Sequence, residues 1–410
     1  GHGMSTAAAL FGAGVGTFVY LLFTKFKSPV FLGSSFAFIG SMNAAFAGAV
    51  SVQAGFAGLL IGAILAGLVY AIIAIVVKKA GVSWIDKLMP PVVIGPTVAI
   101  IGLSLASSAI GNLSKSDVTG GTTNFAVLCG LVALIATTLA STYGKKYTKM
   151  IPFIIGILSG YALAAVLTLI GNATGVESLM ISDFSAFTNL ASGGVTLSTF
   201  FSVPDFTFLT AAKGFSQVDA GYIGTVAVAY IPVAFVVFAE HIADHKNISS
   251  IIEKDLLKDP GLDRTLLGDG IGSIVGAFFG GCPNTTYGES VACVAITKNA
   301  SVATIITAAI ECIVLAFISP IVAFISSIPS CVMGGVCMAL YGFIAVSGLK
   351  MVQKVDLEQN KNLFVVSSIL IAGIGGLQLS FGKITITSIA CALILGIIVN
   401  KLLSKDPSAK

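Results

Sequence analysis

Apolar runs long enough to cross a lipid bilayer dominate this sequence. Hydrophobic residues make up 56% of the 410 residues, charged residues only 10%, and the mean hydropathy is +1.00. A soluble domain normally carries about 25% charged residues. The runs last about 17–25 residues, as a membrane-spanning helix requires, whereas barrel strands alternate over about ten. We therefore expect an all-α polytopic protein of a cell membrane.

Thirteen apolar spans can be delimited. They lie near residues 5–24, 35–50, 53–77, 91–110, 125–143, 150–170, 220–245, 264–281, 288–298, 300–322, 330–347, 362–378 and 384–404. Two of them, 35–50 and 288–298, are too short to cross about 30 Å of hydrocarbon. Each follows an extended-looking stretch, so each is expected to be half strand and half helix.

The distribution of positive charge supports this layout. Under strict alternation, 19 of the 22 Lys and Arg residues fall on one face, and only Lys115, Lys213 and Lys383 fall on the other. The positive-inside rule makes the first face cytoplasmic. The same parity places residue 1 outside, and Gly1-His2-Gly3 resembles a tag remnant. We therefore expect one further helix before Met4 in a parent of 14 spans, divided into two sets of seven.

The polar stretch from Cys282 to Glu289 interrupts the apolar pattern. Lipid cannot hydrogen-bond a bare backbone, so non-helical chain at membrane depth lies inside protein or beside a water-filled cavity. The two short spans are third in each set of seven, and interrupted segments at matching positions are typical of transporters with inverted repeats. Glu289 is in the first turn of its half-helix, where the helix dipole favours an anion.

Five acidic residues lie in or beside apolar spans: Glu240, Asp244, Asp269, Glu289 and Glu311. A carboxylate at mid-helix costs at least about 2.5–3.5 kcal/mol on insertion scales, so these side chains are expected to face the interior. Glu240 and Asp244 are spaced i to i+4 and share one helix face. Two ionised carboxylates this close repel, which favours a shared, transferable proton. Asp269 is expected either to brace the site or join a proton path, or to make a structural hydrogen bond, and Glu311 to hold helices together.

Other polar and aromatic residues receive more modest roles. We expect His241 to bond locally and His245 to lie at the membrane interface. Phe36 and Tyr341 are candidates to pack on a planar ring. Seven scattered cysteines without a CxxC pair indicate neither a disulfide framework nor a metal site. No enzyme motif, cofactor site or nucleic-acid-binding pattern is recognised. Acids without intramembrane cations favour a neutral or cationic hydrogen-bonding cargo.

Several longer motifs resemble one family. They are Leu32-Gly-Ser-Ser-Phe-Ala-Phe-Ile39, Ala239-Glu-His241, Lys254-Asp-Leu-Leu-Lys-Asp-Pro-Gly-Leu262, Pro283-Asn-Thr-Thr-Tyr-Gly-Glu289 and Leu340-Tyr-Gly342. In order and over about residues 5–404, they resemble the nucleobase/ascorbate transporter family (nucleobase:cation symporter-2), and within it the bacterial uracil permeases. The resemblance implies proton symport.

The resemblance also implies a fold of 14 helices in two inverted seven-helix repeats, with core and gate domains and two short strands at the broken helices. The first helix of that fold has no counterpart here. The implied divisions are repeat-1 core plus first gate helix, 5–110; repeat-1 gate, 111–170; external connector, 171–219; repeat-2 core, 220–322; and repeat-2 gate, 323–404. Family analogy suggests a homodimer through the gate domain.

The resemblance assigns site residues by motif. The implied substrate-binding residues are Glu240, Glu289, Phe36, Tyr287, Gly288 and Tyr341. The implied proton-coupling residues are Asp244, Glu240 and Asp269. Asp244 replaces the histidine of some uracil permeases and matches some purine carriers, and Ser290 and Ala292 replace an expected Asn and Gly. Glu289, where purine branches often carry Gln, favours uracil.

The hypothesis is therefore a proton-coupled symporter that imports uracil by alternating access. The alternatives are a xanthine- or urate-type purine:proton symporter and, less favoured, an anion transporter of the same fold. An anion carrier is expected to show a basic residue or a neutral cavity rather than paired acids. A membrane enzyme is disfavoured because its motifs are absent.

Overall fold

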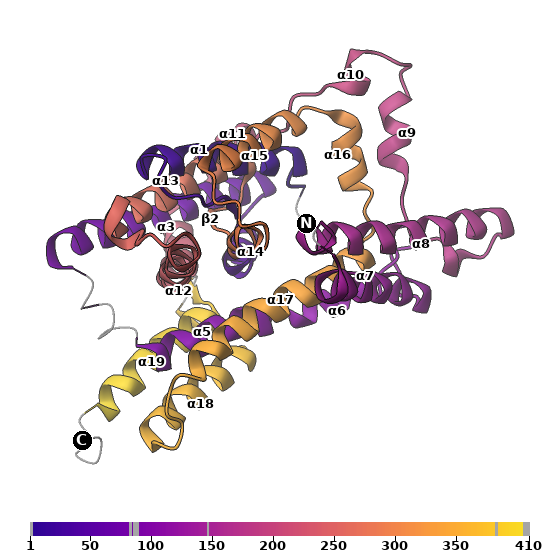
Figure 1. Ribbon diagram of the computed structural model, residues 1–410. Helices are drawn as coiled ribbons and strands as arrows, with labels where there is room; N and C mark the ends of the chain where they lie inside the picture. The colour runs from indigo at the N-terminus through magenta and orange to yellow at the C-terminus, as the bar shows by residue number, and fades with distance from the viewer. Residues whose placement is uncertain (1–2, 82–83, 85–89, 146, 382–383, 405–410) are drawn as a thin grey trace. The chain divides into compact units, whose positions relative to one another are not determined.

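The computed structural model describes residues 3–81, 84, 90–145, 147–381 and 384–404, and they are mainly helical (Figure 1). The all-α membrane fold is confirmed. Seven described helices are long and apolar enough to cross a bilayer: Thr6–Phe23, Val52–Ala80, Pro91–Leu113, Asn124–Tyr143, Pro152–Thr174, Ala220–Ile252 and Ser330–Val352. Shorter apolar helices accompany them at Phe36–Ala47, Val302–Leu315, Asn360–Ile374 and Ser388–Leu403.

The chain forms two compact units. The first comprises Gly1–Ile101, Val203–Phe317 and Ser347–Lys410, and the second comprises Gly102–Ser202 and Ile318–Val346. Elements that lie in the first unit are α1 (Thr6–Phe23), β1 (Leu32–Ser34), η1 (Phe36–Phe38), α2 (Ile39–Ala47), α3 (Val52–Ala80), most of α5 (Pro91–Ser104), α11 (Thr207–Ala212), η4 (Phe215–Gln217), α12 (Ala220–Ile252), η5 (Leu257–Gly261), α13 (Leu262–Gly280), β2 (Asn284–Thr286), α14 (Gly288–Thr297), α15 (Val302–Leu315), α18 (Asn360–Ile374), β3 (Leu379–Phe381), β4 (Ile384–Ile386) and α19 (Ser388–Leu403). Elements that lie in the second unit are α6 (Ala106–Leu113), α7 (Asn124–Tyr143), η2 (Thr148–Met150), α8 (Pro152–Thr174), η3 (Glu177–Leu179), α9 (Ser185–Ala191), α10 (Leu197–Phe200), α16 (Ser319–Ser326) and most of α17 (Ser330–Val352).

Small residues bring α1 and α13 together at the centre of the first unit. A Cβ atom added at Gly16 would lie 2.9 Å from the carbonyl oxygen of Gly272, and one at Gly12 would lie 2.5 Å from that of Gly276. Glycines four residues apart on each helix thus leave room for backbone against backbone. Such close approach replaces the hydrophobic driving force that lipid does not provide. α13 also packs on α3, and α15 packs on α1.

The two interrupted segments meet in a short antiparallel ladder. Leu32 pairs with Thr286 and Ser34 with Asn284, so β1 and β2 satisfy each other's backbone groups. Side chains complete the pattern: Thr17 Oγ1 accepts from the Leu32 amide at 3.0 Å, and the Ser273 hydroxyl donates to the Asn284 carbonyl. Each strand is followed by a short helix, α2 or α14. The expectation of half strand and half helix at both places is therefore confirmed.

The second unit is centred on the packing of α7 against α8. Its core contains the small or β-branched residues Ala126, Cys129, Ala133, Ala164, Ile181, Cys331, Val332 and Val336. Asp117 closes this unit at the start of α17, where its carboxylate accepts from the Ser330 amide at 2.7 Å and the Ser330 hydroxyl at 2.6 Å. An acid at this place also complements the positive end of the helix dipole.

Three expected spans differ in detail from the structure. The span 91–110 is divided into α5 and α6 near Leu105, and the span 300–322 is divided into α15 and α16. Pro320 accounts for the second division, because proline fits the first turn of a helix but not its interior. The span 384–404 begins instead with β4, which pairs with β3, and α19 starts only at Ser388.

The α1–α13 seam generates a stability prediction. A Cβ atom at Gly272 would lie 2.6 Å from Leu32 Cδ1 and 2.9 Å from the Gly16 carbonyl oxygen. We expect Gly272→Ala to destabilise the purified protein by about 1–3 kcal/mol, because this packed seam has no space for a methyl group. Gly40→Ala is the matched control, since nothing lies within 4 Å of the added atom. Equal thermal unfolding temperatures for the two variants would contradict the prediction.

Candidate functional site

The candidate site is organised by α12, a helix of 33 residues with two chemically different faces. Asp219 caps its start by accepting from the Tyr222 amide at 2.6 Å. Glu240 and Asp244, four residues apart, share one face. His241 and His245 share the next face, about 100° further round the helix. The same two turns of helix thus present acids to one set of neighbours and imidazoles to another.

The acidic face is directed at the tip of the half-helix α14. A Cβ atom added at Gly288 would lie 3.6 Å from Asp244 Oδ1 and 4.0 Å from its Oδ2. Gly288 is the first residue of α14, and the first amides of a helix have no acceptor within that helix. Asp244 and Glu240 are both half-buried. A carboxylate and a helix N-terminus therefore face one another across a space that a side chain at residue 288 would occupy.

The tip of α14 is held by the other interrupted segment. The Tyr287 ring lies against Gly33 of β1, where an added Cβ would come within 2.6 Å of ring atom Cδ2. Ser290 Oγ donates to the Tyr287 carbonyl at 2.8 Å. The turn η1, which begins at Phe36, packs on α12. Both interrupted segments thus contact α12, with Phe38 of η1 stacked on Tyr230.

The Asp269 carboxyl group lies on the other side of α12, bonded to His241. His241 Nδ1 is 2.6 Å from Asp269 Oδ2, and its Nε2 is 3.0 Å from Thr265 Oγ1. The Thr265 hydroxyl donates to the Leu262 carbonyl, so Nε2 must be the donor to Thr265. One proton then remains for the short contact between His241 and Asp269. The local bond expected for His241 is confirmed, and its partner is an acid that is fully buried.

His245 is fully buried within the protein, and its position at the membrane interface stays a prediction. Its Nδ1 is 2.8 Å from the His241 carbonyl, which can only accept, so Nδ1 carries a proton. Its Nε2 is 2.7 Å from the hydroxyl of Tyr20, which lies 2.6 Å from Ser28 Oγ. The two imidazole rings stack with centroids 4.0 Å apart. This chain of bonds joins α12 to α1 and to the segment before β1.

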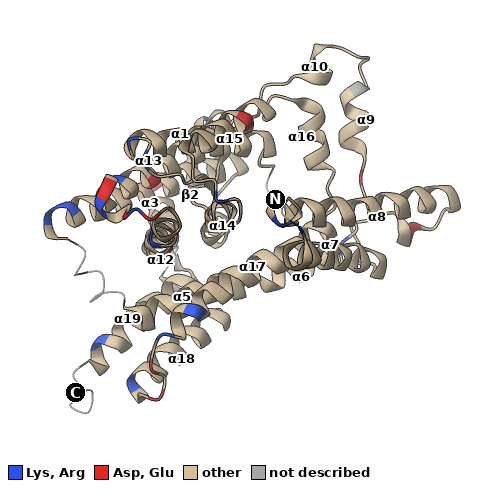
Figure 2. Cartoon of the chain, viewed as in Figure 1, with Lys and Arg blue, Asp and Glu red and all other residues tan. Residues whose placement is uncertain are grey.

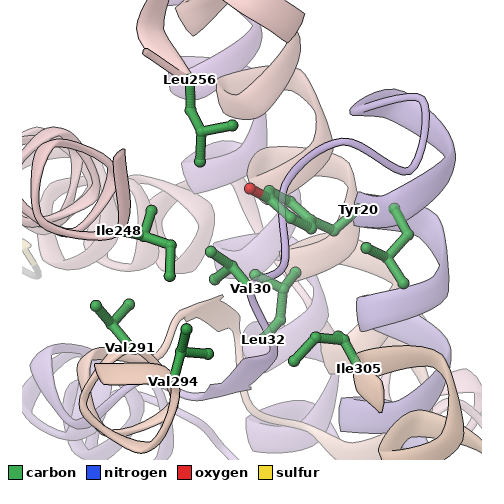
Figure 3. Close-up of a cluster of buried hydrophobic side chains, with 9 residues drawn as sticks. Tyr20, Val30, Leu32, Ile248, Leu256, Val291, Val294 and Ile305 are labelled. Atoms are coloured by element: carbon green, nitrogen blue, oxygen red, sulfur yellow. The ribbon is translucent and has the colours of Figure 1, made fainter. Parts of the chain in front are cut away.

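Apolar side chains surround the Tyr20 end of this chain of bonds (Figure 3). The buried cluster comprises Tyr20, Leu21, Val30, Leu32, Ile248, Leu256, Val291, Val294 and Ile305. Water is kept away from these polar groups, and a bond broken here leaves a buried donor or acceptor without a substitute. The histidine face of α12 is therefore an anchored face.

Most of the candidate site residues predicted from the sequence lie in the first unit. Glu240 and Asp244 lie on α12 and Asp269 lies on α13, all within the first unit. The first unit also contains Phe36, Tyr287 and Gly288. The side chain of Glu289 lies outside the described residues, although its backbone is in the first turn of α14.

Two of the indicated residues lie elsewhere. Tyr341 belongs to α17 in the second unit. Glu311 is exposed on α15.

Tyr20, Ser28 and Thr265 are site residues that the sequence reasoning missed. The signal for His245 was present, because His241 and His245 have the same i to i+4 spacing that singled out the acids. Nothing in the sequence indicates that Tyr20, 225 positions away, is the partner of His245.

Charged residues elsewhere gather in loops and at helix ends, with long uncharged stretches of helix between them (Figure 2). Within the described part of the chain, no group of three or more His, Cys, Asp and Glu side chains is arranged to hold a metal ion. The intramembrane acids are therefore set apart from the rest of the charge, and nothing described competes with them as a candidate site.

Interrupted helices that meet beside buried acids, in a chain with several membrane spans, define a multi-pass membrane transporter. The comparisons agree. The profile described as "Permease family" matches residues 2–381. The chain is 38% identical over 416 residues to the "Uracil permease" of Bacillus subtilis (strain 168), covering 100% of this chain and 88% of that protein. It is 34% identical over 407 residues to the "Uracil permease" of Escherichia coli (strain K12), covering 98% and 86%.

A solved structure supports the fold. The transmembrane domain of a cyanobacterium bicarbonate transporter, BicA, matches with a TM-score of 0.59 at 14% identity, over 97% of this chain and 90% of that one. Identity this low supports likeness of fold alone. Together these findings give the family: the chain belongs to the permease family. It is a multi-pass transporter of the bacterial inner membrane and not an enzyme.

The anchored face of α12 generates a second stability prediction. Tyr20→Phe removes a hydroxyl that bridges His245 and Ser28, and we expect it to destabilise the protein by about 1–3 kcal/mol because buried polar atoms lose their partner. Tyr230→Phe is the matched control. Tyr230 is equally buried, and its hydroxyl has no hydrogen-bond partner among the described residues. Thermal unfolding in detergent measures both, and a control at least as destabilised as Tyr20→Phe would show the idea to be wrong.

Proposed function

We propose that the protein imports uracil across the cytoplasmic membrane together with a proton. The observation that carries the proposal is the Asp244 carboxylate beside Gly288, at the tip of a half-helix within the membrane span. The relatives at 34–38% identity that are named uracil permeases support the choice of cargo. Paired acids also favour a small neutral solute over an inorganic anion.

The chemistry of uracil suits this arrangement. A planar pyrimidine dione offers carbonyl oxygens as acceptors and ring N–H groups as donors. In the proposal, its carbonyls accept from the amides at the start of α14, beside Tyr287 and Gly288, where the helix dipole adds to the attraction. Its N–H groups donate to Glu240 and Glu289. Phe36 packs on the ring face.

Asp244 is the proposed coupling residue, with Glu240 and Asp269 as its partners. Glu240 and Asp244 are one helix turn apart, so ionising both is costly and one proton is readily shared. In the proposed cycle, a proton taken up from outside reduces the repulsion between these acids and permits uracil to bind. Loss of that proton to the cytoplasm restores the repulsion, and affinity for uracil drops.

Alternating access is proposed for the movement of the site across the membrane. Each interrupted segment is a three-residue strand followed by a short helix, and the two strands pair antiparallel, as two inverted repeats would arrange them. In this proposal a core that carries the site moves against a gate. The gate includes Tyr341 and forms the contact of a homodimer. The divisions proposed for core and gate are those expected from the sequence.

A purine carrier is the second candidate. Asp244, four residues after Glu240, is the observation that favours it, because the motif resemblance associates this residue with some purine carriers. An anion carrier has only likeness of fold in its favour.

Proton coupling can be tested in proteoliposomes. We expect Glu240→Gln to reduce uracil uptake roughly 10- to 100-fold, because a charged acceptor for the ligand N–H is lost. Asp244→Asn is expected to leave uptake that no longer responds to a proton gradient. Glu311→Gln is the control, since that acid is exposed on α15 away from α12. Full gradient dependence in both Glu240→Gln and Asp244→Asn would sink the coupling proposal.

Competition separates uracil from purines. Unlabelled uracil is expected to reduce uptake of radiolabelled uracil at concentrations at least about tenfold below those at which xanthine or hypoxanthine does so, since a purine needs room for a second ring. Xanthine competing as well as uracil would shift the assignment to the purine carrier while leaving the site in place.

A further inference from the structure

A narrow apolar groove opens on the first unit where α3, α11 and α13 meet. Its volume is about 250 Å³. α3 supplies Leu60 and Ile64. The opposite wall contains the ring of Phe208, stacked on that of Phe278 with centroids 4.6 Å apart and planes 4° apart. Figure 1 shows α11, α3 and α13 gathered in this part of the unit.

The lining of the groove is apolar. The remaining groove residues are Ala212, Phe215 and Ile274, so every lining residue that the structure describes is apolar. Its volume is below the range of about 300–1,000 Å³ that is usual for small-molecule sites, and a ligand that needs polar contacts finds none. A flexible hydrocarbon chain fits both the shape and the chemistry.

The groove lies at the depth of the outer leaflet. The positive-inside rule places Lys78 and Lys79, at the end of α3, on the cytoplasmic side. α3 therefore starts on the outside at Val52, and its 29 residues, roughly 44 Å of helix, are longer than the about 30 Å of hydrocarbon. Leu60 lies roughly 12 Å along this helix from Val52, in its outer half. An acyl chain reaches this depth from an outer headgroup.

Lys213 is next in sequence to Ala212, which lines the groove. It lies at the end of the short helix α11, and its side chain is exposed. None of the ion pairs found in the described part of the chain involves Lys213. It is one of only three positive residues on the external face by the alternation of spans. An amine at the interface attracts an anionic headgroup.

We propose that this groove binds one acyl chain of an anionic phospholipid of the outer leaflet, with Lys213 at the lipid phosphate. The lipid is bound as a ligand at a defined position rather than as bulk solvent. The inference does not depend on the proposed transport function, because none of the groove residues belongs to the candidate substrate site. The bound chain covers the exposed parts of Ile64, Phe215 and Phe278.

Native mass spectrometry of the full chain in detergent tests the proposal. Phosphatidylglycerol and phosphatidylcholine with identical acyl chains are added in turn, and bound copies are counted as lipid concentration rises. Wild-type protein is expected to retain one phosphatidylglycerol more tightly than phosphatidylcholine by roughly fivefold, the effect of one lysine near a headgroup.

Two pairs of variants distinguish binding of the acyl chain from binding of the lipid headgroup. Ile64→Trp fills the groove and is expected to weaken binding of both lipids roughly tenfold, because buried methylenes are lost. Ile72→Trp is its control, since Ile72 is exposed on α3 but does not line the groove. Lys213→Gln is expected to abolish the preference for phosphatidylglycerol, whereas Lys115→Gln, on the same external face but in the second unit, keeps it.

Thermal unfolding in detergent at the wild-type temperature verifies that Ile64→Trp and Lys213→Gln fold. Binding by Ile64→Trp equal to that of Ile72→Trp would overturn the acyl-chain site. A preference for phosphatidylglycerol that survives Lys213→Gln would overturn the role of the lysine. Tight retention of detergent or of a second copy of the chain, with no bound phospholipid at any concentration, would overturn the proposal as a whole.

Discussion

The antiparallel pairing of β1 with β2 is the interaction on which the site depends. Two stretches of this chain leave the helical conformation within apolar surroundings, where each unpaired backbone group costs several kcal/mol. The two stretches hydrogen-bond each other's backbone groups, with Gly33 opposite Thr285. Side chains of Thr17 and Ser273 bond further backbone groups of the strands. Because the strands pair, the helices that follow them begin at fixed places inside the unit, and α14 starts beside α12.

That pairing requires space, and small residues provide it. Gly272 sits where α13 contacts both α1 and the Leu32 side chain, and Gly33 admits the Tyr287 ring. In water, large apolar side chains at such positions would gain more from burial. In lipid the gain is absent, and close backbone contact is the stronger source of association. Glycines such as Gly272 and Gly33 therefore make room for the paired strands and for the helices packed beside them.

The sequence predicted the elements better than it predicted their partners. Local signals were sufficient for the two half-strand, half-helix segments, because proline, glycine and polar residues interrupted apolar runs too short to span a bilayer. The short helices near Leu105 and Pro320 and the β3–β4 pair were missed, since apolar composition does not distinguish one long helix from two short elements. At the site, Glu240 and Asp244 were found by spacing alone. The contact of His245 with Tyr20 was not predicted, because no local pattern records a contact between residues so far apart.

The two faces of α12 differ in a way that supports the proposed role of its acids in transport and of its histidines in anchoring the helix. His241 and His245 are fully buried, and each ring nitrogen has a short contact with a named partner. Groups satisfied in this way resist change, since every rearrangement exposes an unpaired donor or acceptor. Glu240 and Asp244 are half-buried, and Asp244 lies beside Gly288 at the start of a helix, where the dipole favours a polar ligand. A rigid face and a responsive face on one helix allow a ligand or a proton to act on the acids while α12 stays fixed to α1 and α13.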